Sequence, residues 1–142
     1  MQHGRCGTIP FPIFGAYAQH GNVPYRLLVE KLLNRLLPAP LLRVTAPTST
    51  EATVTRQKNR TIIHLLQYCP ERRATGLDLV EDVVPVFNVP VSVRLAKAPR
   101  QVYLAPGREP IPISYQDGRV NFTVPELRGH AMIVLDGTRS SR

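Results

Sequence analysis

The chain has 142 residues, a hydrophobic content of 43% and a formal net charge of +8. This length suits one domain, or one domain with a piece of another, and the hydrophobic content excludes an intrinsically disordered chain. The basic residues are scattered along the chain, which disfavours nucleic-acid binding, and no apolar run approaches the roughly 20 residues of a membrane helix.

Residues 1–39 are expected to contribute one extended segment and one helix. Thr8 to Phe14 is a short apolar run, and its two prolines favour an edge strand or an extended segment because proline cannot donate to a central ladder. Gly15 to Gly21 is expected to follow as a loop or short turn.

The clearest helix in the sequence runs from Asn22 to Leu37. Asn22 suits the N-cap, Pro24 lies in the first turn, where its missing N–H costs little, and Pro38 ends the helix. Apolar side chains at spacings of three and four form one stripe that includes Leu28, Leu32 and Leu36. One strand and one helix make no core of their own, so the stripe is expected to pack on the following sheet, on a domain outside this chain or on a second copy.

Pro38-Ala39-Pro40 reads as a stiff linker and as the boundary between a segment 1–39 and a domain 40–142. Short alternating segments follow it, separated by many of the chain's 14 prolines. We expect about eight strands, in the segments Leu42–Ala46, Glu51–Gln57, Arg60–Pro70, Val89–Leu95, Val102–Ala105, Ile111–Tyr115, Arg119–Val124 and Ala131–Leu135. Leu77–Val86 is a further, less regular extended segment. The predicted fold class is therefore mainly β, an antiparallel β-sandwich preceded by a strand and a helix.

Two turns are predicted between these strands. Lys58-Asn59 links two alternating segments, and Asp117-Gly118 is the strongest hairpin signal because glycine tolerates the positive φ that such turns need. Cys69 to Gly76 is expected to be a polar loop, and Gly137 to Arg142 to fray.

The run from Arg60 to Pro70 is apolar on both faces of an extended chain. Ile62, His64, Leu66 and Tyr68 share one face, and Ile63, Leu65 and Gln67 share the other. Antiparallel sheets often leave one face to water, so this strand is predicted to be covered on both sides.

The spacing of the carboxylates in the sequence does not indicate a catalytic pair of acids. A glycosidase needs two carboxylates about 5–10 Å apart in a cleft. Glu81 and Asp82 are adjacent and would point to opposite faces of a strand, and Asp78 lies four residues before Asp82 on chain that is not expected to be helical. No catalytic residue is therefore assigned.

The sequence likewise shows no motif for a catalytic nucleophile, a general base or a metal site. His64 is expected to be a packed strand residue, on the opposite face from Cys69, and His130 a turn residue; Ser92 and Ser114 lack a nucleophile elbow. His3 and Cys6 have a metal-like spacing, but two ligands are not a site, and His20 stands alone, so no metal, cofactor or cofactor-binding residue is predicted. A disulfide between Cys6 and Cys69 stays open as an alternative.

Two binding functions remain as alternatives. A carbohydrate-binding sandwich would use exposed aromatic side chains; the chain has no Trp, and its candidates, Tyr103, Tyr115, Phe87 and Phe122, are more in keeping with a core. A basic nucleic-acid-binding domain would need its arginines on one face. The N-terminal residues lack the pattern of a signal peptide, so a cytoplasmic location is expected.

Ordered short motifs over about residues 7–136 resemble a known family. The motifs are PIF, Y-x-x-H-G, Y-R-x-L-V, R-L-L-P, R-x-x-I-x-H-L-L-x-Y-x-P-E-R-R, V-x-V-R-L, V-Y-L-A-P, Y-x-D-G-R-V and V-P-E-L-x-G-H-A-M-I-V-L. They are similar to the C-terminal end of large bacterial glycoside hydrolases like the family-forty-two β-galactosidases, which carry a catalytic barrel, an α/β trimerisation domain shaped like a glutamine amidotransferase, and a terminal β-sandwich.

The resemblance implies that residues 1–39 are the last strand and helix of the α/β domain and that residues 40–142 are the terminal sandwich. The family's catalytic glutamates lie in the barrel, which has no counterpart here, so no catalytic residue carries over. The expected function is a non-catalytic accessory or assembly module of a glycoside hydrolase-like protein, and the chain is expected to be a fragment with no enzymatic activity of its own.

Overall fold

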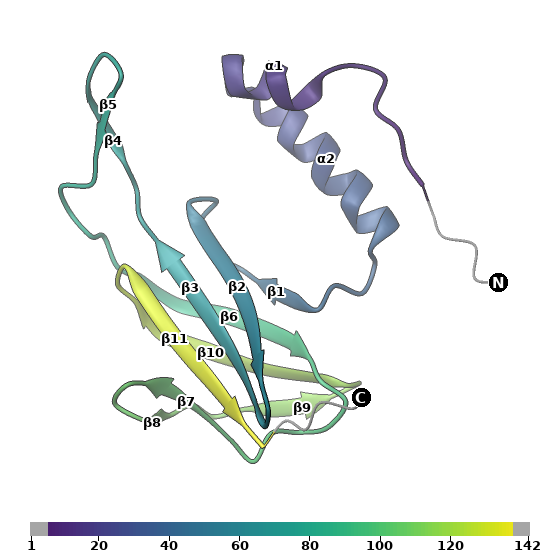
Figure 1. Ribbon diagram of the computed structural model, residues 1–142, viewed down its shortest axis with the longest axis vertical. Coiled ribbons are helices and arrows are strands. Elements are labelled where there is room, and N and C mark those ends of the chain that lie inside the picture. Colours follow the sequence, from purple (N-terminus) through teal and green to yellow (C-terminus); the bar gives the residue numbers. More distant parts are fainter. Residues whose placement is uncertain (1–5, 138–142) are drawn as a thin grey trace. The chain divides into compact units, whose positions relative to one another are not determined.

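The computed structural model describes residues 6–137. Its chain divides into two compact units, Met1–Pro40 and Leu41–Arg142. The first unit contains both helices of the described residues, and the second contains all of their strands (Figure 1). No helix in the described part of the chain is long and apolar enough to cross a membrane.

The N-terminal unit begins with α1 (Ile13–His20), which corrects two sequence-based predictions. Thr8 to Phe14 forms no strand, and most of the stretch expected to be a loop, Gly15 to Gly21, is helical. Pro12 occupies the N-cap position, where a missing N–H costs little, and Gly21 ends the helix with a φ of 61°. The proline and glycine that suggested extended chain and loop are therefore the boundaries of a short helix.

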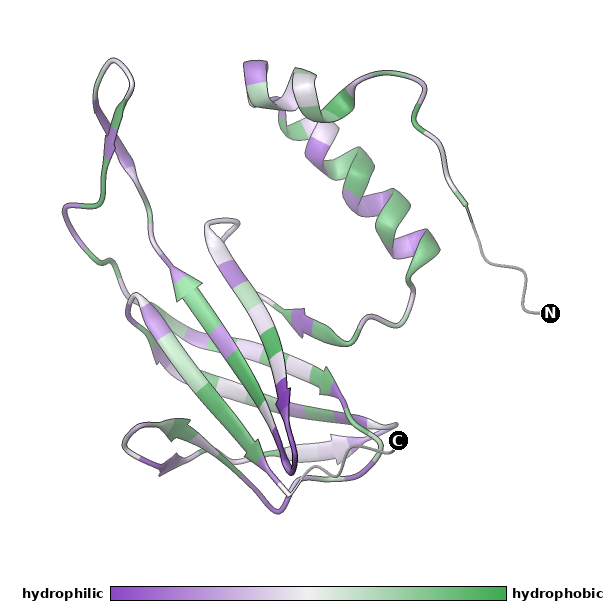
Figure 2. Cartoon of the chain, viewed as in Figure 1, coloured by the Kyte–Doolittle hydropathy of each residue, from purple (hydrophilic) through white to green (hydrophobic). Residues whose placement is uncertain are grey.

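The second helix, α2 (Val23–Leu36), confirms the predicted one, with Asn22 at the N-cap position and a proline in the first turn. The rings of Phe11 and Tyr25 lie 6.0 Å apart between centroids and connect the N-terminal segment to α2. No residue of α2 is buried, and Leu28 is 45% exposed. Figure 2 shows hydrophobic and hydrophilic residues, in green and purple, following one another along this helix.

The C-terminal unit is an antiparallel β-sandwich with an additional small hairpin (Figure 1). One sheet has four strands in the order β1-β6-β10-β9, the other has five in the order β2-β3-β11-β7-β8, and β4 and β5 pair with each other. The strands are β1 (Leu42–Val44), β2 (Thr50–Gln57), β3 (Arg60–Gln67), β4 (Glu71–Ala74), β5 (Leu77–Leu79), β6 (Val86–Arg94), β7 (Gln101–Ala105), β8 (Glu109–Pro110), β9 (Ser114–Gln116), β10 (Arg119–Leu127) and β11 (His130–Asp136). The predicted fold class, mainly β with a sandwich, is confirmed.

Valine, leucine and isoleucine side chains from both large sheets form the core between them. β6 contributes Val89, Val91 and Val93, and β3 contributes Ile63 and Leu65, all of them buried in one cluster. The period-two alternation of these strands places every second side chain in this core.

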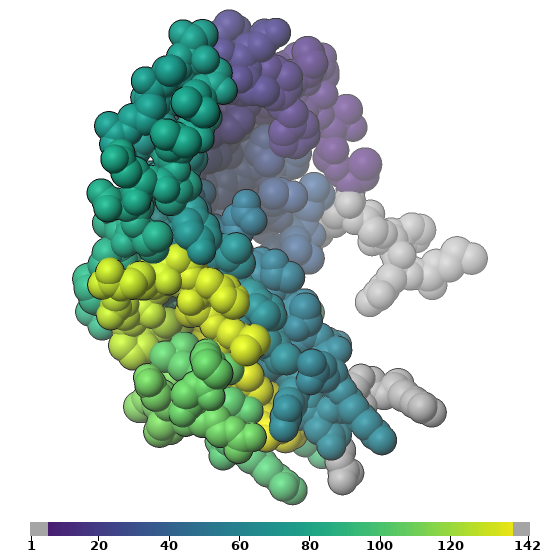
Figure 3. Space-filling model, turned by 60° about the vertical axis from the view of Figure 1, so that its left-hand side comes forward, coloured from purple at the N-terminus to yellow at the C-terminus, as the bar shows by residue number. Residues whose placement is uncertain are grey.

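The second face of β3 is covered only in part, although its two-sided apolar pattern predicted cover along the strand; Leu66 on this face is 37% exposed. Ile62 packs there with Tyr103 of β7 and Val134 of β11 in a separate buried cluster. β11 lies in the middle of this sheet, between β3 and β7, and Figure 3 shows it in yellow between the neighbouring teal and green segments. Neighbouring strands of the same sheet therefore supply much of the cover for this face.

The predicted turns are confirmed, and the predicted polar loop is wrong. β2 and β3 pair across Lys58-Asn59, and β9 and β10 pair across Asp117-Gly118, where both turn residues have positive φ. Cys69 to Gly76 contains β4, which pairs with β5 across a turn, with a register shift between Arg72 and Ala74. The alternating apolar signal is missing from β4, whereas Leu77 and Leu79 of β5 alternate with Asp78 and lie in the predicted segment Leu77–Val86.

Candidate functional site

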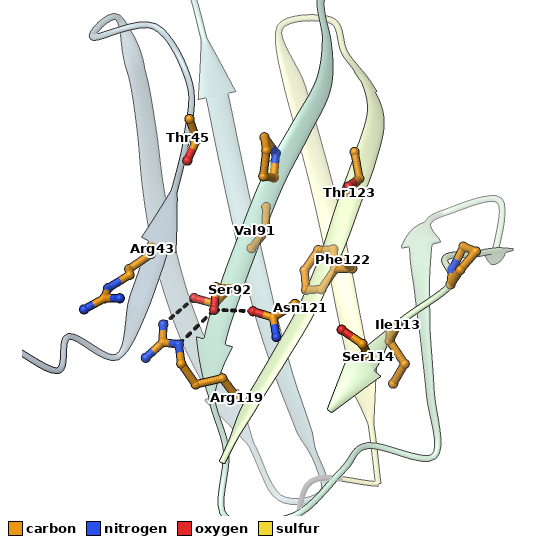
Figure 4. A pocket seen from close by; sticks show the side chains of 12 residues that line it. Arg43, Thr45, Val91, Ser92, Ile113, Ser114, Arg119, Asn121, Phe122 and Thr123 are labelled. Atoms are coloured by element: carbon orange, nitrogen blue, oxygen red, sulfur yellow. Dashed lines mark hydrogen bonds between the residues drawn. The ribbon is translucent and has the colours of Figure 1, made fainter. Parts of the chain in front are cut away.

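A broad groove of the C-terminal unit lies on the outer face of the four-stranded sheet (Figure 4). It has a volume of about 750 Å³ and is contained within this unit. Its polar lining comes from β1, β6, β9, β10 and the segment after β1: Arg43, Thr45, Ser92, Ser114, Arg119, Asn121 and Thr123.

The strand register explains why these polar side chains meet. Arg43 is opposite Ser92 across β1 and β6, and Ser92 is opposite Asn121 across β6 and β10. Residues directly opposite one another in antiparallel strands point to the same face. Because Val91 and Val93 of β6 face the core, Ser92 between them faces outward.

A hydrogen-bonded chain fixes the centre of the groove (Figure 4). Arg119 donates from Nε to Ser92 Oγ at 2.8 Å and from Nη2 to the Ser92 carbonyl oxygen at 2.8 Å. Ser92 Oγ in turn donates to Asn121 Oδ1 at 2.6 Å. The guanidinium of Arg119 is thereby held in one orientation at the groove wall.

The groove is electropositive. The pKa of Arg119 is lowered from its ordinary value first by burial and then by the nearby charges of Arg43 and Arg94. Arg94 is directly opposite Arg119 in the β6–β10 register, so like charges face each other across two strands. None of the residues that line the groove carries a carboxylate. The arrangement can attract and orient an anionic group.

Two of the three carboxylates considered in the sequence, Asp78 of β5 and Glu81 just after it, are ion-paired with arginines of β4. Arg72 donates to both carboxylate oxygens of Asp78, one of them at 3.2 Å. Arg73 pairs with Glu81 and also with Glu71, at 3.1 Å from the latter. These contacts account for Asp78 and Glu81 as exposed structural charges in and directly after the hairpin.

Two histidines that the sequence separates by 66 positions meet on the outer face of the five-stranded sheet. His64 Nδ1 and His130 Nε2 share a hydrogen bond of 3.1 Å, and their rings are stacked with an interplanar angle of 5°. His130 was predicted to lie in a turn, but it is the first residue of β11, because the turn ends one residue earlier at Gly129. Cys6 and Cys69 are both exposed free thiols, and His3 lies outside the described residues.

The two tyrosines considered for sugar stacking do not form a common platform. Tyr103 lies in the five-stranded sheet and is only 6% exposed. Tyr115 lies in the four-stranded sheet, is 37% exposed, and donates from its hydroxyl to the Leu95 carbonyl oxygen at 3.2 Å. Within residues 6–137, no group of three or more His, Cys, Asp or Glu side chains is arranged to hold a metal ion.

Sequence reasoning missed the arginine groove, although part of the signal was present. Ser92 and Arg94 on one strand, and Arg119 and Asn121 on another, are the polar positions of two alternating segments. That alternation predicts an outward polar face for each strand. It does not predict that the two segments are neighbours, which follows from the pairing of β6 with β10.

Comparison with known proteins relates the chain to part of a glycoside hydrolase. No protein-family model matches, and no curated protein matches. Among solved structures, α-L-fucosidase isoenzyme 2 from Paenibacillus thiaminolyticus is similar, with 33% sequence identity and a TM-score of 0.83 over 88% of this chain. The chain spans only 20% of the length of that fucosidase.

A second solved structure, a cycloisomaltooligosaccharide glucanotransferase from Paenibacillus sp., matches 66% of this chain and 16% of its own, with 15% identity and a TM-score of 0.47. These values are too low to support an argument about function. The fucosidase match supports a domain related to glycoside hydrolases, and it does not single out the family-forty-two β-galactosidases.

Proposed function

We propose that this chain is a non-catalytic accessory and assembly module of a glycoside hydrolase-like protein. The observation that carries the proposal is the fucosidase match, which takes in 88% of this chain and only 20% of the fucosidase. A module of this kind contributes to the folding or assembly of a larger protein, and other parts of that protein perform the reaction.

The arrangement of acids in the structure supports the same proposal. Asp78 and Glu81 are exposed and pair with arginines of β4, which is a poor environment for a general acid. Glycoside hydrolysis needs a second carboxylate across a substrate cleft, and the groove on the outer face of the four-stranded sheet is lined by none.

The helix α2 supports the assembly part of the role. It is amphipathic, yet none of its residues is buried, and Leu33 and Leu37 at its end are 56% and 58% exposed. Exposed apolar surface of this kind marks an interaction site. The proposed partner surface is a further α/β layer of the parent protein or α2 of a second copy.

The substrate of the parent protein is a separate part of the proposal. Similarity to the fucosidase favours an α-L-fucoside. The sequence resemblance to family-forty-two β-galactosidases favours a β-galactoside, so both substrates belong in the test.

The test is an assay of the purified 142-residue chain with nitrophenyl α-L-fucoside and nitrophenyl β-D-galactoside. We expect no turnover of either substrate above the rate of a buffer control. The matched variant is Asp78→Asn, which removes an exposed carboxylate. Turnover that co-purifies with the chain and disappears in this variant would show that the chain is itself an enzyme.

A further inference from the structure

We propose that the groove on the outer face of the four-stranded sheet binds an oligosaccharide that carries carboxylate groups, with Arg43 and Arg119 of its lining recognising the carboxylate and Arg94 adding positive charge beside them. This binding function goes beyond the assembly role proposed above and does not depend on it. We call these three residues the arginine cluster.

The cluster is created by strand pairing. Arg94 and Arg119 are direct partners in the β6–β10 register, and Arg43 is the direct partner of Ser92, two residues before Arg94. All three side chains therefore belong to one face of the sheet. Like charges placed directly opposite each other destabilise a strand pair, so a bound anion would relieve a repulsion that the free protein carries.

Arg119 is pre-organised to recognise a carboxylate. Two of its nitrogens donate to Ser92, which fixes the plane of the guanidinium before a ligand arrives. A fixed guanidinium pairs with a planar carboxylate at a lower entropic cost than a flexible cation does. Burial and the charges of Arg43 and Arg94 lower the pKa of Arg119, which agrees with three cations lying close together at this face of the sheet.

The rest of the groove suits a ligand rich in hydroxyl groups. Thr45 and Ser114 are exposed at its edges, and Asn121 presents an amide whose oxygen is oriented by Ser92. Side-chain hydroxyls and amides can each donate and accept, as sugar hydroxyls do. A volume of about 750 Å³ falls in the range of roughly 300–1,000 Å³ typical of small-molecule sites.

The carboxylate is favoured over a neutral sugar because of what the lining contains and what it lacks. Neutral oligosaccharides usually bind by stacking on exposed aromatic rings. The aromatic residue that lines this groove, Phe122, is 6% exposed and belongs to the core. Charge complementarity therefore supplies the recognition that stacking would otherwise give.

The test is calorimetric titration of the 142-residue chain with a tetrasaccharide of galacturonic acid, and with a neutral galactose tetrasaccharide as the matched ligand. We expect the acidic probe to bind at least about tenfold more tightly than the neutral one at low salt, and to weaken as salt is raised. Equal binding of the two probes, or no binding of the acidic probe, would overturn the proposal.

The variants locate the site. Arg119→Gln and Arg43→Gln are each expected to weaken binding of the acidic probe by about tenfold, since a hydrogen bond to a charged group contributes roughly that factor. Arg56→Gln is the control; it removes the same charge from an exposed position on β2, in the other sheet, and should change the affinity less than about twofold. Equal losses in all three variants would mean non-specific attraction and would contradict the site.

Two further measurements keep the result interpretable. Far-UV circular dichroism reports whether Arg119→Gln still folds; Arg43 is exposed, so its variant tests the site even if Arg119→Gln does not. A poly-glutamate peptide and a single-stranded oligonucleotide of equal charge are titrated in parallel. Tighter binding of either one than of the acidic tetrasaccharide would assign the groove to a protein or nucleic-acid partner and reject the proposal.

Discussion

On β3, two neighbouring leucines differ in what their side chains contact. Leu65 is fully buried in the core between the sheets, whereas Leu66 is 37% exposed on the outer face. Both were expected to be covered, since the strand is apolar on both faces. The outer cover comes from Tyr103 and Val134 and reaches Ile62, so the two faces are buried to different depths.

This difference predicts unequal effects of the same substitution. Leu65→Ala should lower the free energy of unfolding by about 2–5 kcal/mol, because it removes buried methyl groups and leaves a cavity. Leu66→Ala, the matched control, should cost about 1 kcal/mol or less. The measurement is urea unfolding followed by far-UV circular dichroism, which suits a chain without Trp. Similar losses for the two variants would contradict the assignment of the faces.

At the scale of elements, the β4–β5 hairpin is a case in which sequence patterns do not predict the strand pairing. Its strands have no buried residue, and no alternation of apolar and polar residues marks β4. Charged side chains connect the two strands instead, and Arg72 is directly opposite Asp78 in their register. A cross-strand ion pair of this kind depends on the pairing of β4 with β5, which the local sequence does not predict.

The hairpin should respond to acid. Hydrogen bonding from Arg72, aided by its charge, holds the pKa of Asp78 below its ordinary value of 3.8. A group whose pKa is lower in the folded state stabilises that state above its unfolded pKa, and the contribution is lost as the pH falls through the folded pKa. We therefore expect the hairpin to loosen only below about pH 4.

The measurement is an NMR titration of the Asp78 carboxyl carbon and the Gly76 amide. Arg72→Ala should return the pKa of Asp78 to its ordinary value, whereas Arg56→Ala, an exposed arginine on β2, should leave it unchanged. An Asp78 that already titrates at the ordinary pKa in the unmodified chain would show that the pair does not persist in solution.

At the scale of the whole molecule, the two compact units differ in how completely they are packed. The sandwich has a continuous core that draws only on residues after Pro40. In the N-terminal unit, Ile13 is the single buried residue of α1 and α2. The sandwich therefore has the features of an independently folding domain, and the helical pair has those of a piece that needs a partner.

Deletion of residues 1–40 should accordingly leave the sandwich folded, with a Tm within a few degrees of the full chain. The same deletion should abolish self-association at high concentration, because it removes the exposed apolar face of α2. Thermal circular dichroism and sedimentation velocity measure the two effects. In the full chain, Leu28→Glu should reduce self-association as the deletion does, and Glu30→Gln is the control on the same helix. A deleted chain that fails to fold would contradict the division into units.

Local patterns in the sequence determined the mainly β class, the helix α2, the hairpin at Asp117-Gly118 and the two-sided character of β3. Each depends on residues close together in the chain, where helical or strand periodicity and turn chemistry act directly. The helix α1 was missed because its bounding proline and glycine also favour extended chain and loops.

Only the tertiary structure decided which residues meet across the sheets. Ser92 and Arg119 are 27 positions apart, and His64 and His130 are 66 apart. Alternation fixes which side chains share a face of one strand, but the order and register of the strands are chosen by the packing of the whole core. The arginine cluster, the stacked histidines and the shallow outer cover of β3 all arise from that choice.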